Sequence, residues 1–322
     1  MKVSKKTIII IAVILVIAGA VISSSVFMFS DFKYSDLSDS KSETNTHIIN
    51  ESFDNISVSS GAFDVNFFYS DDNECKVICK ESDKIRHSVS VENNTLTIKE
   101  DETEWFDHIN FMVIEKYELN VYLPENVYET LDINCSSGDI TVPGNFNFNK
   151  NADISVSSGD VNFDGHVKGN LEITATSGDI KITGAEANEI TASVTSGDIR
   201  CVNVTAFNRL NTTATSGDIT VKDSTMDYFY NSTTSGSTDL INTTVDYDIN
   251  MESTSGDITL ERCDADSLEL SSTSGNIEGS LLSSKIFSVD TNSGDIDIPD
   301  SVSGGKCDVE TTSGNIDFEI CG

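Results

Sequence analysis

Apolar and polar side chains alternate on both sides of a recurring Ser-Gly pair through most of the chain after residue 130. Around Gly178 the apolar positions are Leu171, Ile173 and Ala175 before the glycine, and the alternation resumes at Ile180 after it. A period of two residues is typical of β-strands with one buried face. The pattern therefore predicts units of two short strands joined by a tight corner. No sustained apolar period of 3.6 residues follows residue 30, so we expect no helix there.

The unit recurs ten times with a spacing of 19 to 21 residues. Its corner glycines are Gly138, Gly159, Gly178, Gly197, Gly217, Gly236, Gly256, Gly275, Gly294 and Gly314. A unit of this length cannot bury its own apolar face, so the copies must stack, with equivalent strands about 4.8 Å apart. The sequence thus predicts an all-β fold, a parallel β-helix (β-solenoid) of about ten coils over residues 131–322. The corners should form one column, with these isoleucines stacked inside beside them: Ile140, Ile180, Ile199, Ile219, Ile258 and Ile296.

The residue after each corner glycine is the first candidate for chemistry. It is Asp or Asn in nine of the ten copies and Ser237 in the sixth. The first five copies carry the weak metal candidates Asp139, Asp160, Asp179, Asp198 and Asp218. Stacked carboxylates repel by about 0.9 kcal/mol per pair even in water, and Ca²⁺ could relieve this. Asn replaces Asp in later copies, however, and capping of the turn backbone accounts for both residue types. We therefore expect a structural corner that binds calcium weakly at most.

The N-terminal 47 residues have a different composition. Residues 1–6 contain three lysines and are expected to form a cytoplasmic tail, whereas residues 7–29 are uncharged and long enough to span a bilayer as a transmembrane signal-anchor helix. Basic residues before the span and acidic residues after it predict a single-pass protein of the cell membrane, with its C-terminal domain extracellular. A cleaved signal peptide is the alternative, because several small residues follow the apolar run. Residues 30–47 are expected to be a polar linker.

Residues 48–130 show a less regular β pattern. Asn93-Asn94 lies between two alternating runs and predicts a hairpin, while Ser60-Gly61 resembles an early, irregular coil. The segments "FDNISVSSGAFDVNF" and "VYLPENVYETLDI", followed by serial "SSGDI" and "TSGDI" copies, resemble the bacterial cell-envelope proteins grouped as "putative adhesins", a family with a domain of unknown function. The resemblance covers residues 48–322. It implies a β-helix-like fold outside a bacterial membrane, in some cases encoded beside envelope-stress regulators, and it brings no catalytic residues.

The chain is strongly acidic, with a net charge of −33. Residues 131–322 contain 31 acidic and 9 basic side chains, a balance of −22. Nucleic acids and anionic lipids are poor partners for such a surface, and cations, cationic polymers or basic proteins are better ones. Solubility outside the cell is an equally simple reason for the charge.

The seven cysteines follow no metal or disulfide motif. Cys135, Cys201 and Cys307 occupy offsets at which neighbouring copies carry apolar residues, so we expect them in the core. Cys75 and Cys79 would share one face of a strand about 13 Å apart, too far for a disulfide. Metal ligation by this pair would need other partners, and the nearest histidine, His87, lies in the next segment.

No catalytic motif stands out. Polysaccharide-degrading solenoids use paired carboxylates, and stacked aspartates meet that spacing trivially, but basic partners are scattered and no phosphate loop, zinc spacing or nucleophile elbow is present. The sequence therefore favours a non-enzymatic binding or scaffolding protein of the cell surface, with a glycan or protein ligand and no cofactor. The alternative is a regulatory envelope-stress protein that acts on a membrane sensor. No capping element follows Ile320, so weak self-association through the C-terminal coil is expected.

Overall fold

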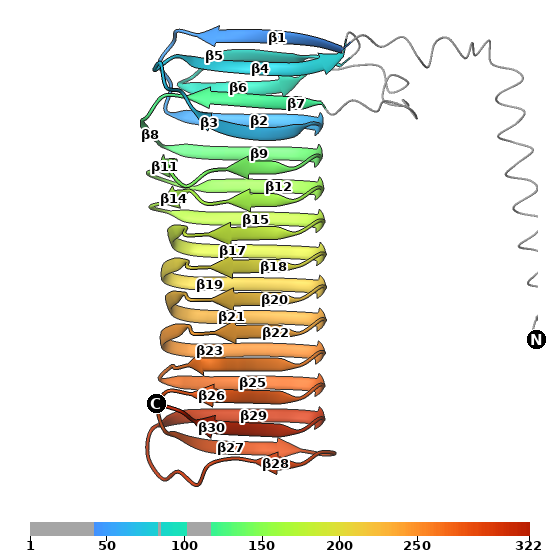
Figure 1. Cartoon of the computed structure of the whole chain (residues 1–322), viewed down its shortest axis with the longest axis vertical. Coiled ribbons are helices and arrows are strands. Elements are labelled where there is room, and N and C mark those ends of the chain that lie inside the picture. Colours follow the sequence, from blue (N-terminus) through green and yellow to red (C-terminus); the bar gives the residue numbers. More distant parts are fainter. Residues whose placement is uncertain (1–41, 83–84, 102–116) are drawn as a thin grey trace, which may run out of the picture.

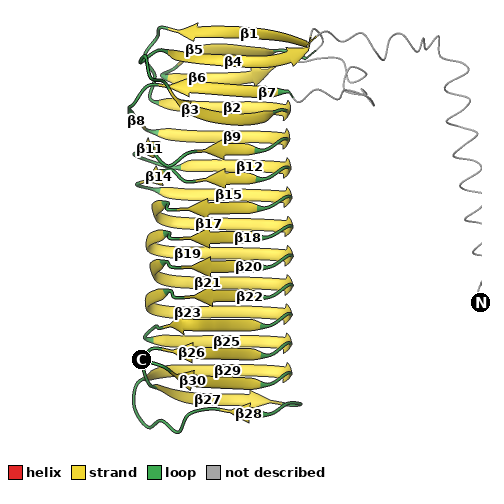
Figure 2. Ribbon diagram, in the orientation of Figure 1, coloured by secondary structure: helices red, strands yellow, loops and turns green. Residues whose placement is uncertain are grey.

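The computed structural model describes residues 42–82, 85–101 and 117–322, and this part of the chain consists of strands and connections without any helix. The strands stack into one long column, as Figures 1 and 2 show. The expected tail and transmembrane segment, residues 1–29, lie outside the described residues. Among the residues that are described, no helix has the length and apolar character needed to cross a membrane.

Two large sheets form the broad faces of the column, and a small third sheet closes part of one side. The long-strand sheet contains, in stacking order, β5 (His87–Glu92), β6 (Thr95–Glu100), β2 (Asn55–Ala62), β9 (Thr130–Ser137), β12 (Ala152–Ser158), β15 (Asn170–Ser177), β17 (Glu186–Ser196), β19 (Thr205–Ser216), β21 (Thr225–Ser235), β23 (Thr244–Ser255), β25 (Ser267–Ser274), β29 (Gly305–Ser313) and β27 (Lys285–Thr291). The short-strand sheet contains β1 (Ser42–Ile49), β4 (Cys75–Ser82), β7 (Glu118–Leu123), β3 (Asp64–Tyr69), β10 (Ile140–Val142), β13 (Val161–Phe163), β16 (Ile180–Thr183), β18 (Ile199–Val202), β20 (Ile219–Lys222), β22 (Thr238–Ile241), β24 (Ile258–Cys263), β26 (Ile277–Leu281), β30 (Ile316–Ile320) and β28 (Ile296–Asp297). The third sheet contains β8 (Val127–Tyr128), β11 (Asn147–Phe148) and β14 (His166–Val167).

Equivalent offsets pair between neighbouring coils, as a parallel solenoid requires. Ile173 of β15, for example, lies opposite Ile154 in one neighbouring coil and Ala192 in the other. The inward residues of both large sheets form one continuous apolar core along the column. Cys135, Cys201 and Cys307 are buried in that core, as their offsets predict. The fold class is therefore the predicted parallel β-solenoid.

The ten Ser-Gly corners form the predicted column. The backbone N–H of every corner glycine except Gly294 donates to the carbonyl of the serine in the adjacent coil, as Gly178 does to Ser196 at 3.0 Å. The isoleucine ladder also forms, and five of its six predicted members are buried. Ile296 is the exception, with 45% of its surface exposed. It stands at the correct offset, but its coil ends the stack and has no neighbour to cover it.

The stack extends further toward the N-terminus than the repeats suggest. β2 and β3 form a complete coil next to β9 and β10, on the N-terminal side of the repeats, and the parallel strands β6 and β7 form the next one. The corner of the first of these coils is Phe63, because Ala62 pairs with Ser137. Ser60-Gly61, expected to mark an early, irregular coil, does lie in such a coil but two residues before its corner, and the Ser60 side chain points into the core.

Antiparallel strands close this end of the column. β5 and β6 form the predicted hairpin, with Asn93 and Asn94 at positive φ, and β4 and β1 add to the edge of the short-strand sheet. Strand β1 begins at Ser42, so residues 42–47 belong to the folded column and not to the linker that we expected there. The linker was predicted from the polar composition of these residues. An outer strand can have the same composition, because it needs few buried side chains.

The other end of the column does not follow the order of the sequence. β29 lies between β25 and β27, and β30 lies between β26 and β28. The last copy in the sequence is thus inserted as an internal coil, and the copy before it, β27 with β28, is the outermost one (Figure 1). The expected open end at the C-terminal coil is therefore wrong: the open end belongs to residues 285–297.

Candidate functional site

The aspartates after the corner glycines form a hydrogen-bonded ladder. Oδ1 of Asp160 accepts the backbone N–H of Asp179 at 2.8 Å, and Oδ1 of Asp179 accepts that of Asp198 at the same distance. Equivalent bonds of 2.7 to 3.0 Å join the pairs Asp64/Asp139, Asp139/Asp160, Asp198/Asp218, Asp218/Ser237, Asp257/Asn276, Asn276/Asn315 and Asn315/Asp295. Each side chain thus caps the backbone of the next coil rather than its own turn.

This ladder explains the mixture of residues at the corner. Asn supplies the same carbonyl oxygen as Asp, so Asn276 and Asn315 continue the series without charge. The hydroxyl of Ser237 is too short to replace them, and within residues 117–322 no side chain accepts the N–H of Asp257. Four of the aspartates line a shallow groove of about 240 Å³ together with Lys181 and Arg200. Among the described residues, the ligand atoms that lie close enough together to hold one metal ion belong to Cys79, Glu81 and His87, not to this column. The hydrogen bonds of the Asp and Asn side chains instead join the corners of adjacent coils.

A row of aromatic rings lies on the outward face of the long-strand sheet. The rings of Tyr228 and Tyr247 stack with centroids 5.1 Å apart and planes 25° from parallel, and Tyr230 follows at 6.5 Å and 17° from Tyr228. Tyr228 and Tyr230 alternate along β21, so both point outward, while Tyr247 is 47% exposed on β23. The guanidinium of Arg209 lies 5.1 Å above the ring of Tyr230 and ends the row.

Polar side chains flank this tyrosine row. Asn211 and Asn250 lie on either side of Tyr230 in the adjacent strands, and Glu252 lies one outward position further along β23. With Thr213 and Ser232 they line a groove of about 400 Å³. The groove therefore brings amide, hydroxyl and carboxylate groups beside Tyr230, the member of the tyrosine row that lines it.

The surroundings of the tyrosine row are acidic. Loss of hydration raises the pKa of the Tyr228 hydroxyl above its ordinary value, and Tyr247, Asp248 and Asp227 raise it further by electrostatic repulsion. The sequence contains a signal for this site, because "MDYFY" and "VDYDI" place a tyrosine three residues after the start of β21 and of β23. The repeats were aligned only around the corner glycines, so this pair of tyrosines was not recognised from the sequence.

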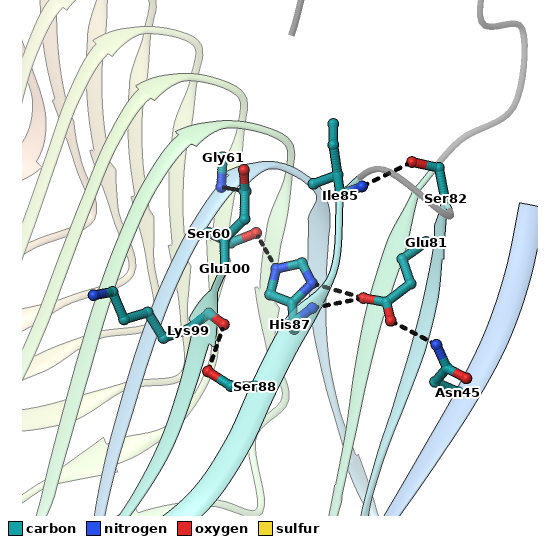
Figure 3. A network of polar contacts seen from close by, with 10 residues as sticks. All are labelled: Asn45, Ser60, Gly61, Glu81, Ser82, Ile85, His87, Ser88, Lys99 and Glu100. Carbon is teal, nitrogen blue, oxygen red and sulfur yellow. Dashed lines mark hydrogen bonds and ion pairs between the residues drawn. The ribbon is translucent and has the colours of Figure 1, made fainter. Parts of the chain in front are cut away.

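A second polar site is buried at the N-terminal end of the column. Nε2 of His87 lies 3.0 Å from Oγ of Ser60, and Nδ1 of His87 lies 3.1 Å from Oε2 of Glu81. The backbone N–H of His87 also donates to Oε2 of Glu81 at 2.8 Å, and Nδ2 of Asn45 donates to Oε1 at 2.7 Å. Figure 3 shows the imidazole between the serine and the carboxylate. All three central side chains are buried.

The order Ser60, His87, Glu81 is that of a hydrolytic triad, but the surroundings differ from those of an active site. The Ser60 side chain points into the core, and its residue is only 6% exposed. The N–H of Gly61, which would be the natural donor to an oxyanion, is 2.5 Å from Oε2 of Glu100. A carboxylate in that place repels a developing negative charge, whereas acyl transfer requires free donors there. The three side chains therefore form a buried hydrogen-bonded network in which the position of an oxyanion donor is taken by a carboxylate.

Cys79 lies beside this buried network. One ligand atom each from Cys79, Glu81 and His87 lie within 4.8 Å of one another. Burial raises the pKa of the Cys79 thiol to about 12, and the Glu81 carboxylate adds to the rise. From the sequence, metal ligation by Cys75 and Cys79 needed other partners, and the nearest histidine, His87, lies in the next segment. The fold brings that histidine to Cys79, whereas Cys75 is not part of the group.

Comparisons with known proteins place the chain in a family. The model of the Toastrack DUF4097 family matches residues 53–246 and 244–320. A search of curated protein sequences gave no match. Among solved structures, a "putative adhesin" from Bacteroides fragilis is 14% identical with a TM-score of 0.44, and the match covers 87% of this chain and 97% of that one. A "putative adhesin" from Parabacteroides distasonis is 14% identical with a TM-score of 0.47, and covers 87% and 98%.

The two structural matches are too distant to carry an argument about function. The family match is different in kind, because it spans the regular coils and most of the N-terminal cap. This chain belongs to the Toastrack DUF4097 family.

Proposed function

We propose that this protein is a non-enzymatic binding or scaffolding protein, adhesin-like in role and displayed outside a bacterial membrane by residues 7–29. Its ligand is a glycan that lies along the tyrosine row of β21 and β23. The observation that carries the proposal is the stack of Tyr228, Tyr230 and Tyr247 on an outward sheet face beside a groove of amides and hydroxyls.

The chemistry of the row suits sugar rings. Aromatic side chains present flat apolar area together with a polar tip, so they accept the apolar face of a sugar while neighbouring groups bond its hydroxyls. Asn211, Asn250 and Glu252 provide such groups beside Tyr230. The carboxylates near Tyr228 disfavour anionic polymers, so the glycan is a neutral or amine-bearing one.

A screen of the full chain against immobilised glycans tests this function. We expect binding to neutral or amino sugars, and the variant Tyr228→Ala with Tyr247→Ala should lose at least about tenfold in affinity, equivalent to about 1.4 kcal/mol. The control is Phe68→Ala with Tyr122→Ala, which removes a comparable stacked pair, 5.0 Å apart, from the short-strand sheet. Capture of protein ligands without any glycan, or equal losses in both variants, would refute the glycan assignment.

A further inference from the structure

We propose that Cys79, Glu81 and His87 bind a divalent transition metal ion of the Zn²⁺ class at the N-terminal end of the column. The three residues offer a sulfur, an oxygen and a nitrogen ligand, and these atoms lie within 4.8 Å of one another. Thiolate, carboxylate and imidazole are the groups that bind Zn²⁺ in proteins. The inference is independent of glycan binding, because the tyrosine row lies many coils away.

The fold brings the three side chains together in the interior of the column, from two opposite sheets. Cys79 and Glu81 are two residues apart on β4, so both point into the core. His87 begins β5 on the opposite sheet and faces them across the interior. Bond lengths of about 2.3 Å to sulfur and about 2.0 to 2.2 Å to nitrogen and oxygen place tetrahedral ligand atoms about 3.3 to 3.6 Å apart, so atoms that now lie up to 4.8 Å apart must approach by roughly 1.2 Å. Nδ1 of His87 and Oε2 of Glu81, at 3.1 Å, already lie near that separation. Small side-chain rotations provide a movement of that size.

Two further residues orient the ligands in the way that metal sites require. Ser60 Oγ lies 3.0 Å from Nε2 of His87, which leaves Nδ1 directed toward Glu81. Asn45 holds Oε1 of Glu81 at 2.7 Å, so Oε2 faces the histidine. Partners of this kind fix the tautomer of a ligating histidine and the orientation of a ligating carboxylate. Hydrogen bonds thus preorganise two of the three ligands.

The third ligand lacks such a partner. Among the described residues, the Cys79 thiol makes no hydrogen bond, although it is fully buried beside the His87 and Glu81 groups. The ring of Phe63 packs edge-on against His87 at 4.4 Å and keeps that side of the space apolar. A thiolate and a carboxylate together neutralise a divalent cation, so the filled site would carry no net charge into the core.

Metal binding by the full chain tests the proposal. The exposed thiol is first removed as Cys321→Ser, because it could bind metal by itself. After exposure to Zn²⁺ and gel filtration, we expect about one Zn²⁺ per chain, because the described residues contain one such group of three ligands. Co²⁺ in place of Zn²⁺ should give a thiolate-to-metal charge-transfer band. Ser60→Ala should weaken binding by about 10- to 100-fold, as the loss of such a supporting residue does elsewhere.

The matched variants are Cys79→Ala and Cys75→Ala, because both remove a buried thiol from the same face of β4. We expect the first to abolish the charge-transfer band and the second to retain it. Folding of each variant is checked by circular dichroism, and His87→Gln provides an independent loss of the nitrogen ligand. A wild-type chain that retains no Zn²⁺ and shows no sulfur band with Co²⁺ would overturn the proposal and leave a hydrogen-bonded network only.

Discussion

The corner glycines show how closely neighbouring coils approach. At Gly217, φ is +140°, and an added Cβ would lie 1.8 Å from the carbonyl oxygen of Gly197 in the adjacent coil. The same collision, at 2.0 or 2.1 Å, would occur at Gly275, Gly294 and Gly314, where φ lies outside the left-handed region. Close approach is therefore the requirement shared by all coils, and positive φ is an additional one in some of them.

Replacing Gly217 by valine should consequently destabilise the column. We expect a loss of more than about 1 kcal/mol, and up to about 3, because backbone strain adds to the collision with Gly197. Gly184→Ala is the control, since φ there is +64° but no atom lies within 4 Å of the added Cβ. Chemical denaturation measures both, and equal losses in the two variants would contradict the close-approach argument.

The aspartate ladder makes a second prediction at this scale. Asp218→Asn keeps the oxygen that accepts the Ser237 N–H, so stability should change little, whereas Asp218→Ala should cost about 0.5 to 1.5 kcal/mol. Thermal unfolding with and without millimolar Ca²⁺ provides the measurement. A calcium-dependent rise of several degrees that Asp218→Asn abolishes would show that the column is a metal site.

At the scale of elements, the order of the last coils is the main departure from the sequence. The hydrogen bonds of the aspartate ladder follow this order: the N–H of Asn315 donates to Oδ1 of Asn276, and the N–H of Asp295 donates to Oδ1 of Asn315. Lys285, at the start of β27, is buried, and its Nζ lies 2.5 Å from Asp264 and from Ser283. The ion pair between Lys285 and Asp264 lies where the chain leaves β26 and skips one coil, the coil filled by β29, to reach β27.

Hydrogen exchange can test this order directly. Strand β29 is paired on both sides and β27 on one, so the amides of residues 305–313 should exchange more slowly than those of residues 285–291. Stacking in sequence order would give the opposite result, because β29 would then be the frayed outer strand. Strand β25 serves as the internal reference, since both of its edges are paired in either order.

At the scale of the molecule, the column is closed at one end and open at the other. Antiparallel strands form the N-terminal end, where Val89 and Val91 are partly buried, and Phe287, Val289 and Ile298 are partly buried at the other end, which has no antiparallel strands. Ile286 and Ile296 are also 49% and 45% exposed there. Unpaired strand edges with exposed apolar residues favour association, and the net charge of −33 opposes it.

We therefore expect weak self-association through the coil of β27 and β28, stronger at high salt because repulsion between acidic chains is then screened. Ile286→Lys should reduce it, whereas Ile48→Lys, at a still more exposed position in the N-terminal strand β1, should not. Sedimentation at high protein concentration distinguishes these cases. A strict monomer at high salt would contradict the prediction.

The local pattern of the sequence was sufficient for most of the column. Alternation around residues such as Ile173 and Ile180 identifies the buried face, and the spacing of the glycines sets the coil length, because both are properties of neighbouring residues. The tyrosine row could also have been found by registering the copies farther from the corner. The position of the corner after Ser60-Gly61 and the first residue of β1 could not have been found in this way. Both depend on the register with the neighbouring strand.

What the sequence by itself determined is thus the coil and its corner: two strands, a glycine at the turn, and a side-chain oxygen expected to cap the turn backbone. The structure corrected the last point, because that oxygen caps the backbone of the next coil. Only the tertiary structure decided the order of the last coils, because all copies share one register and any of them can pair with any other. It also decided the buried group of Cys79, Glu81 and His87. Those residues lie on strands of opposite sheets, and no local pattern records that their side chains meet across the core.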